Sequence, residues 1–150
     1  MKEFYHNKRV LVTGGAGFIG SHLVQALVDL GAEVVVLDNL STGTLANLKE
    51  VITRIAFIYG DIRHERTVLK AAVGCSAIFH LAACTSVPLS VKKPDYCFDV
   101  NVTGTRLLLN AAVQHNVARF IFASSSAVYG PENKIHKEQD RLCPASPYAE

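Results

Sequence analysis

Apolar residues in this chain gather in short runs that alternate with segments of helical periodicity. Runs rich in Val, Ile and Phe, typical of buried strands, cover residues 8–13, 33–37, 55–59, 77–81 and 120–123. Apolar residues at helical spacing predict helices over residues 18–30, 45–51, 63–73 and 94–114, and a polar, proline-containing stretch predicts a loop over residues 129–144. Strands alternating with helices indicate an α/β fold with a parallel sheet.

Composition and charge indicate an ordinary globular domain. The chain has 150 residues, 49% hydrophobic and 19% charged, and we assign residues 1–150 to one domain. Its net charge of +2 comes from dispersed side chains, which argues against a nucleic-acid partner. No apolar run approaches the roughly 20 residues of a membrane helix, and the N-terminus has no signal-peptide pattern, so we expect a cytoplasmic protein without a membrane partner.

The cysteines give no sign of a metal site. Cys75, Cys84, Cys97 and Cys143 form no CxxC pair and have no zinc-ligand spacing. We expect free thiols and no bound metal, as is usual for a cytosolic domain of this size.

A glycine-rich turn joins the first predicted strand to the first predicted helix. Residues 13–20 read Thr-Gly-Gly-Ala-Gly-Phe-Ile-Gly. Phosphates suit such a place because helix N-terminal N–H groups are unpaired and the helix dipole is positive there. Glycine allows the tight turn and the close approach of a ligand, and Gly20 lets the helix pack closely on the strand. A turn without a ligand is the alternative, but the flanking strand and helix favour a dinucleotide.

Asp38 ends the second predicted strand. An acidic residue at this place binds the ribose hydroxyls of a dinucleotide. Because a carboxylate would repel the 2′-phosphate of NADP, the sequence favours NAD as the cofactor.

The spacing Gly14-x-x-Gly17-x-x-Gly20 resembles that of the extended short-chain dehydrogenase/reductase family. Essentially the whole chain is similar to the NAD-dependent nucleotide-sugar epimerases and dehydratases of that family, nearest to the UDP-glucose 4-epimerases. Further segments follow in the family's order, namely 38–43 (DNLSTG), 60–63 (GDIR), 80–83 (HLAA) and 101–105 (NVTGT). The resemblance implies a Rossmann-like, doubly wound parallel sheet of five strands in the order 3-2-1-4-5.

The resemblance also implies which residues bind the cofactor. Segment 38–43 would surround the adenosine ribose, Asp61 and the backbone after it would meet adenine, and segment 80–83 would lie along the pyrophosphate and nicotinamide ribose. Helix capping by Asp61, and structural roles for His80 and Asn101, are the alternatives. The implied cofactor residues are Gly14, Gly17, Phe18, Ile19, Gly20, Asp38, Asn39, Ser41, Thr42, Gly43, Asp61, Ile62, Leu81, Ala82, Ala83, Thr85, Asn101, Ser124 and Tyr148.

Two residues near the end of the chain match the catalytic residues of the family. Residues 123–130 (ASSSAVYG) follow the fifth predicted strand, where ligands of such sheets lie. The resemblance implies that Ser125 supplies the catalytic hydroxyl and that Tyr148 is the tyrosine of the Tyr-x-x-x-Lys motif. Ser125 and Ser86 would also border the substrate. The lysine of the motif would fall beyond Glu150, which departs from the family pattern.

The function implied is 4-epimerisation of a UDP-sugar through a 4-keto intermediate, by a parent enzyme that is a homodimer. We expect this chain to be the N-terminal, NAD-binding part of that enzyme, without its substrate region. The alternatives are an NAD-binding fragment without turnover, or a related dehydratase or reductase. Dehydratases carry Asp-Glu after the catalytic hydroxyl, where this chain has Ser126 and Ala127, which favours an epimerase. Self-association through the open edge of the fifth strand is a further hypothesis.

Overall fold

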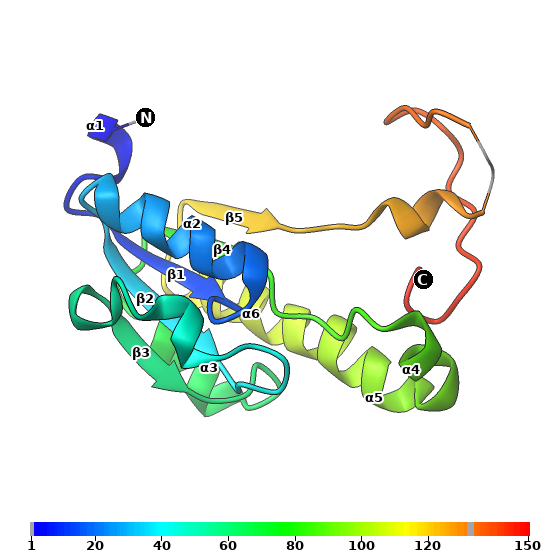
Figure 1. The fold of residues 1–150 in the computed structure, drawn as a ribbon, viewed down its shortest axis with the longest axis horizontal. Helices are drawn as coiled ribbons and strands as arrows, with labels where there is room; N and C mark the ends of the chain where they lie inside the picture. Colours follow the sequence, from blue (N-terminus) through cyan, green and yellow to red (C-terminus); the bar gives the residue numbers. More distant parts are fainter. Residues whose placement is uncertain (1, 132–133) are drawn as a thin grey trace.

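The computed structural model describes residues 2–131 and 134–150. Its centre is one parallel sheet of five strands in the order β3-β2-β1-β4-β5, which confirms the predicted order and fold class (Figure 1). Each strand begins and ends within one residue of its predicted bounds. The strands are β1 (Arg9–Thr13), β2 (Glu33–Asp38), β3 (Ala56–Tyr59), β4 (Ala77–His80) and β5 (Arg119–Phe122).

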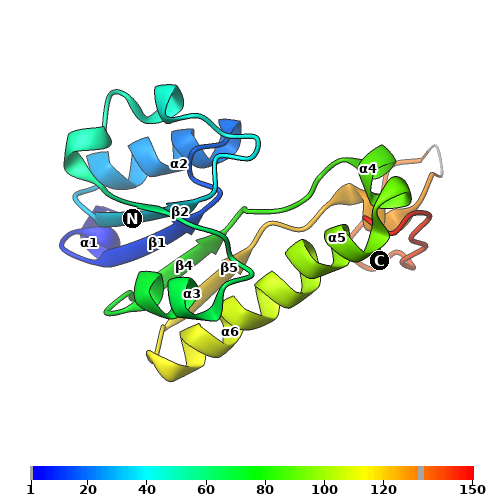
Figure 2. The same cartoon turned by 90° about the horizontal axis from the view of Figure 1, so that it is seen from below.

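Helices cover both faces of this sheet, as Figure 2 shows. Helix α2 (Phe18–Asp29) lies on one face, and α3 (Glu65–Ala72) and α6 (Gly104–Gln114) pack together on the other. A short helix, α1 (Lys2–Tyr5), precedes β1. In the described residues no helix is long and apolar enough to cross a membrane.

The alternation of side chains along the central strands builds a separate core on each face. Successive strand residues point to opposite faces, so each of the two central strands contributes to both cores. Val10, Val12, Val34 and Val36 pack with Val24 and Leu27 of α2. Leu11, Val35 and Leu37 pack with residues of α3 and α6, including Val68, Leu108 and Ala111. This double burial explains why both strands are apolar without interruption.

Two predicted helices differ from the structure. The helix predicted over residues 45–51 is a shorter 3₁₀ helix, Leu45–Leu48, and a second 3₁₀ helix, Ile52–Arg54, follows beyond the predicted range. The segment is short, and its i→i−3 bonds still allow Leu48 and Val51 to reach the core. The predicted helix 94–114 is continuous but has three parts, α5 (Pro94–Phe98), a π-helical turn (Asp99–Thr103) and α6.

Two short helices were missed by the sequence pattern, α1 before β1 and one after β4. Helix α4 (Val87–Lys92) follows the segment after β4, and its N-cap Ser86 accepts a hydrogen bond from the Leu89 N–H at 3.3 Å. A Ser before Val-Pro is a helix-start signal, but six residues are too few to show a periodicity. Beyond β5, a 3₁₀ turn (Ser126–Tyr129) ends where the predicted loop begins.

Candidate functional site

The glycine turn between β1 and α2 is packed so closely that a side chain in place of Gly14 or Gly20 would disturb it. Gly14 has a φ of +70°, and a Cβ there would lie 2.7 Å from the Ala82 backbone nitrogen. A Cβ at Gly20 would collide with the Gly14 carbonyl oxygen and lie 2.8 Å from the Gly15 Cα. The turn therefore brings bare backbone to the carboxyl edge of the sheet.

Helix α2 opens toward this edge without a side-chain cap. Its N-cap is Gly17, and the first helical bond runs from the Ser21 N–H to the Gly17 carbonyl at 3.0 Å. The N–H groups between these residues precede the helical ladder, so they are available to an anion. The structure thus leaves these backbone N–H groups uncapped at the carboxyl edge of the sheet, and phosphate binding by them stays a prediction.

Asp38, at the end of β2, is 8% exposed and faces the glycine turn. Its Oδ2 accepts a hydrogen bond from the Ala16 N–H at 2.9 Å, and its Oδ1 accepts one from the Leu40 N–H at 2.8 Å. Each carboxylate oxygen can accept a second bond, so two acceptor positions remain. The backbone contacts fix the orientation of the carboxylate.

Asp61, after β3, is held by four hydrogen bonds. Its Oδ1 accepts from the backbone N–H and from Nε of Arg63, at 2.9 and 3.0 Å. Its Oδ2 accepts from Arg63 Nη2 at 2.8 Å and from Asn39 Nδ2 at 3.1 Å. The Arg63 side-chain bonds are the largest cause that holds the pKa of Asp61 far below its usual range. Asp61 is therefore ionised at any physiological pH.

His80, at the end of β4, is a buried neutral link between three elements. It is 1% exposed, and burial lowers its pKa to about 4. Its Nδ1 lies 2.7 Å from the Thr13 hydroxyl of β1, and its Nε2 lies 2.8 Å from the Thr105 hydroxyl of α6. This arrangement supports the structural alternative for His80.

The hydroxyl partners indicate which ring nitrogen of His80 carries the proton. The Thr105 hydroxyl donates to the Asn101 carbonyl at 2.6 Å, so it accepts from His80 Nε2–H. The Thr13 hydroxyl accepts from the Ala82 N–H at 3.3 Å and donates to Nδ1. One directed chain of hydrogen bonds therefore links the segment after β4 to the start of α6.

Asn101 fixes the same segment further along. Its Oδ1 accepts from the Cys84 N–H at 2.8 Å, and its Nδ2 donates to the Cys84 carbonyl at 3.1 Å. One side chain thus pairs with both backbone groups of Cys84, as a neighbouring strand would. Asn101 lies in the π-helical turn, where widened turns often place functional side chains.

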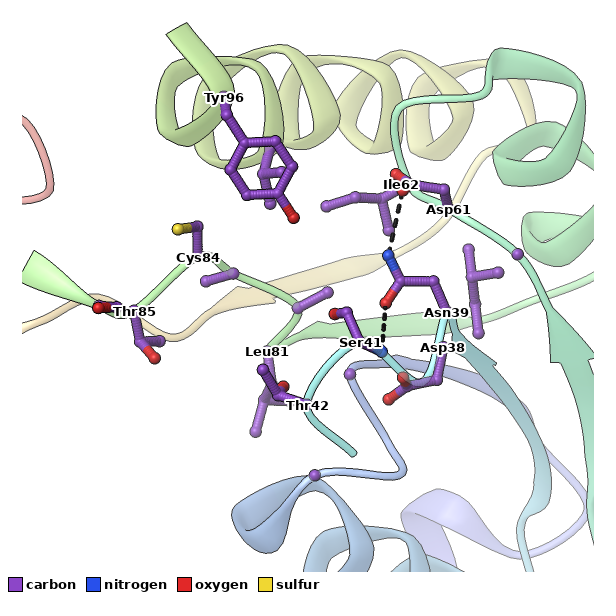
Figure 3. A pocket seen from close by; sticks show the side chains of 18 of the residues that line it. Asp38, Asn39, Ser41, Thr42, Asp61, Ile62, Leu81, Cys84, Thr85 and Tyr96 are labelled. Atoms are coloured by element: carbon purple, nitrogen blue, oxygen red, sulfur yellow. Dashed lines mark hydrogen bonds between the residues drawn. The ribbon is translucent and has the colours of Figure 1, made fainter. Parts of the chain in front are cut away.

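Two cavities flank the segment after β4. The first has a volume of about 320 Å³ and lies over the carboxyl ends of the strands. Figure 3 shows that side chains from β2, from the β3–α3 connection and from the segment after β4 converge on it. Its lining includes most of the predicted cofactor residues, namely Gly14, Gly17, Asp38, Asn39, Ser41, Thr42, Asp61, Ile62, Leu81, Ala82, Ala83 and Thr85, together with Ser86.

The second cavity, of about 420 Å³, gathers the predicted catalytic residues. Ser125 and Tyr148 both line it, with Ser124 and Asn101. Ser125 caps the following 3₁₀ turn through its Oγ, which accepts from the Ala127 N–H at 3.2 Å. Residues 81–83 line both cavities, so one short backbone segment separates them.

Four predicted cofactor residues lie outside both cavity linings. In the described structure, Phe18 and Ile19 begin α2 with 79% and 69% of their surface exposed, and their backbone N–H groups lie at its uncapped start. Gly20 and Gly43 serve close packing instead, since a Cβ at Gly43 would lie 2.7 Å from the Ala16 carbonyl carbon. Roles at a ligand remain predictions for all four residues.

The sequence interpretation missed several residues of the site. Tyr96 of α5 lines the first cavity, and the Arg63 guanidinium lies 5.2 Å from the centre of its ring. Arg63 also donates to Asp99 at 3.3 Å. The GDIR segment did contain Arg63, but its partners Tyr96 and Asp99 lie more than thirty residues away, and no local pattern signals them.

The sequence profile of the family described as "NAD dependent epimerase/dehydratase family" matches residues 10–150 of this chain. Among curated relatives, the UDP-glucose 4-epimerase of Lactobacillus helveticus is 44% identical over 145 residues. The match takes in 95% of this chain and 43% of that enzyme. The chain therefore spans less than half the length of this relative.

Solved structures agree with this assignment. A UDP-N-acetylglucosamine 4-epimerase from Methanobrevibacter ruminantium, in complex with UDP-N-acetylmuramic acid, matches with a TM-score of 0.89 and 40% identity, over 96% of this chain and 46% of that one. The UDP-glucose 4-epimerase of Thermus thermophilus, in complex with NAD, matches with a TM-score of 0.85 and 42% identity, over 94% and 46%. With its profile match, its glycine turn and its sheet order, this chain belongs to the NAD dependent epimerase/dehydratase family.

Proposed function

We propose that this chain is the NAD-binding part of a UDP-sugar 4-epimerase. The observation that carries the proposal is the convergence of the glycine turn, Asp38, Asp61 and residues 81–83 on one cavity at the carboxyl edge of the sheet. Ligands of open parallel sheets bind at this edge. The similarity to the Thermus enzyme, solved with NAD, supports the same cofactor here.

The residues present fit NAD along the whole cavity. The bare backbone at Gly14 and the uncapped start of α2 suit the pyrophosphate. The two remaining acceptor positions on Asp38 suit ribose hydroxyls, and Asp61 with Ile62 suits the base. The nicotinamide end would meet residues 81–83, which also border the cavity of Ser125 and Tyr148.

Calorimetric titration of this chain with NAD and with NADP tests the cofactor proposal. We expect NAD to bind at least about tenfold more tightly, because the Asp38 carboxylate repels a 2′-phosphate. Asp38→Asn should weaken NAD binding and reduce the preference over NADP. Asp29→Asn removes one negative charge from an exposed position and is the matched control. It should change neither the affinity for NAD nor the preference over NADP. Absence of NAD binding by the folded wild-type chain would contradict the proposal.

Ser125 and Tyr148 are the residues that we propose for the chemistry. Bound NAD would supply a hydride acceptor and donor for the sugar C4. Tyr148 would take the proton of the C4 hydroxyl through its phenolic oxygen and later return it. Ser125 Oγ would hydrogen-bond the same sugar oxygen and hold it toward Tyr148. Ser86, which lines the first cavity beside Thr85, would border the substrate.

A related dehydratase is the second candidate, because the family description includes both reactions. Water loss needs an acid and a base beside the sugar C5 and C6. In the family those groups follow the catalytic hydroxyl, where this chain carries Ser126 and Ala127. An alanine side chain can neither donate nor accept a proton, which favours the epimerase.

A chimera tests the activity directly. Residues 10–150 of this chain would replace the matching part of the Thermus UDP-glucose 4-epimerase, and UDP-galactose would be the substrate. We expect UDP-glucose as the product, and loss of at least about 100-fold in rate for Tyr148→Phe. A 4-keto-6-deoxy sugar as product would favour the dehydratase. A chimera that retains NAD but gives no product would favour NAD binding without turnover.

We also propose that the longer enzyme is a cytoplasmic homodimer that uses neither nucleic acid nor a membrane. Exposed apolar residues spaced along one face of α5, the π-helical turn and α6 support a subunit contact, namely Phe98, Val102, Leu109 and Val113. The free thiols at positions 75, 84, 97 and 143 suit a reducing compartment. Sedimentation of the chimera, with and without Leu109→Glu, tests the dimer.

A further inference from the structure

The Asp61 carboxylate has no acceptor position left for a ligand in this structure. A carboxylate offers about four lone-pair positions, two on each oxygen. Three of them accept from Arg63, through its backbone N–H, Nε and Nη2, and the fourth accepts from Asn39 Nδ2. Any additional donor that reaches Asp61 must therefore replace one of these four.

The four bonds differ in how firmly they are held. The Arg63 bonds at 2.8–3.0 Å are reinforced by charge on the side chain and closed within a three-residue turn. Arg63 is itself restrained, by Asp99 at 3.3 Å and by the Tyr96 ring. The Asn39 bond is longer, at 3.1 Å, and joins a neutral amide to the carboxylate from a different strand end. Asn39 is the occupant that a ligand would displace.

Figure 3 shows where that position lies. Asn39 stands at the edge of the first cavity, with its Nδ2 toward Asp61 and its Oδ1 toward the Ser41 backbone. Asp61 and Ile62 line the cavity beside it. An amino group that replaced the Asn39 amide would therefore approach from the cavity side.

We propose that Arg63 is a positioning residue that makes the base subsite selective for a 6-amino purine. Arg63 holds Asp61 as an oriented carboxylate with a single exchangeable acceptor position, which Asn39 occupies until the adenine amino group replaces it. A 6-oxo purine places an acceptor against the same carboxylate and is rejected. This inference rests on the proposed binding of NAD and adds to it the residue that sets base selectivity.

The other ionisable groups around this pair are few. Asp38 lies at the neighbouring strand end, Asp99 and Tyr96 approach from the helix side through Arg63, and His64 follows Arg63 in the turn. The Arg63 guanidinium provides the donors that keep the Asp61 pKa far below its usual range. Removal of Arg63 leaves a largely buried carboxylate, 14% exposed, without its cation, so protonation at mildly acidic pH becomes possible.

Binding of NAD and of nicotinamide hypoxanthine dinucleotide, which has a 6-oxo base, tests the inference by calorimetry. For the wild-type chain we expect NAD to bind at least about tenfold more tightly, with a ratio that is constant between about pH 8 and about pH 5. For Arg63→Met we expect the ratio to fall to about threefold or less, and to fall further toward acidic pH as Asp61 gains a proton that it can donate to the 6-oxo group.

Three further variants keep the test decisive. Arg66→Met removes the same charge from an exposed position on the next turn and should keep the wild-type ratio at every pH. Asn39→Ala should change both affinities and leave their ratio high, since the exchangeable position stays available. Arg63→Lys keeps the charge but not the planar guanidinium, so its ratio of the two affinities should lie between those of wild type and Arg63→Met. This variant keeps the test valid if Arg63→Met does not fold.

The outcomes separate this inference from the proposed function. Binding of neither dinucleotide by the folded wild-type chain would overturn both. Equal binding of the two dinucleotides would overturn the base selectivity and leave NAD binding intact. A wild-type ratio in Arg63→Met and Arg63→Lys would show that Arg63 does not position Asp61, and loss of the ratio in Asn39→Ala would show that Asn39 itself reads the base.

Discussion

The inner strands β1 and β2 and the edge strand β5, which all lead to the candidate site, are packed differently. On the side of β1 and β2, the inner strand residues are almost completely buried, and the carboxylates of Asp38 and Asp61 are held by backbone and side-chain donors. On the side of β5, Ile121 and Phe122 are 39% and 55% exposed, and within the described residues β5 pairs with β4 alone. The first cavity is therefore organised by closely packed elements, whereas the second cavity rests on a weakly covered edge strand.

Truncation of strand side chains gives the largest expected contrast between these two sides. Leu11→Ala in β1 should lower the free energy of unfolding by about 2–5 kcal/mol, because the side chain is fully buried and its removal leaves a cavity. Ile121→Ala in β5 should cost about 1 kcal/mol or less, because much of that side chain already faces water. Denaturant unfolding of both variants measures the difference. Equal losses would show that β5 is as tightly packed as β1.

The glycine turn gives the next largest effect. Gly20→Ala should destabilise the chain by about 1–3 kcal/mol and abolish NAD binding, because the new methyl group collides with the Gly14 carbonyl and forces α2 away from β1. Gly17→Ala is the matched control for stability alone, since its Cβ would lie 3.2 Å from the same oxygen and its φ of −75° suits any residue. Thermal unfolding and calorimetry with NAD check both variants. Equal stability of Gly20→Ala and Gly17→Ala would contradict the close packing at Gly20.

The elements that the sequence predicted well are those whose signal is local. The apolar runs of β1 and β2 and the glycines between them lie within some thirty consecutive residues, and each follows from periodicity or backbone freedom. Helix α4 was not predicted, and the 3₁₀ helices were not delimited correctly, because they are too short for a period to appear. Asn101, in the π-helical turn, bonds Cys84, 17 residues away, and no local pattern signals this contact.

The residues of the candidate site also divide into those with a local sequence signal and those whose contacts are distant along the chain. Asp38 was predicted from its place at a strand end and Asp61 from the family resemblance, and both line the first cavity. The Arg63 contact with Tyr96 and the Thr13 contact with His80 were missed, since sequence separations of 33 and 67 residues hide them. The long-range contacts that hold Asp61 and His80 in place were therefore not predictable from the sequence pattern.

His80 stands between the two sides and predicts a dependence of stability on pH. Its folded-state pKa, about 4, lies below the ordinary value of 6.5, because burial disfavours the charged ring. The unfolded chain therefore binds the proton more readily. The contribution of neutral His80 to the free energy of unfolding is complete above about pH 6.5 and is lost as the pH falls toward about 4. We expect a loss of about 2–3 kcal/mol over this interval.

Unfolding by denaturant at a series of pH values, for wild type and His80→Gln, measures that contribution. The variant should be less stable at neutral pH and should lose less stability between about pH 6.5 and about pH 4. His22→Gln, at an exposed position of α2, should retain the wild-type pH dependence. An unchanged pH dependence in His80→Gln would mean that His80 is not the buried titrating group.

The smallest expected effect belongs to the hydroxyl that links His80 to α6. Thr105→Val keeps the shape of the side chain but leaves the buried His80 Nε2–H without its acceptor, so we expect a loss of about 1–2 kcal/mol. Thr105→Ser restores the hydroxyl and should recover most of that loss. Hydrogen exchange of the Ala82 N–H, which donates to Thr13 at the other end of the chain of bonds, should accelerate in Thr105→Val alone. If Thr105→Val and Thr105→Ser behave alike, lost packing explains the effect, and the two sides of the sheet are not coupled through His80.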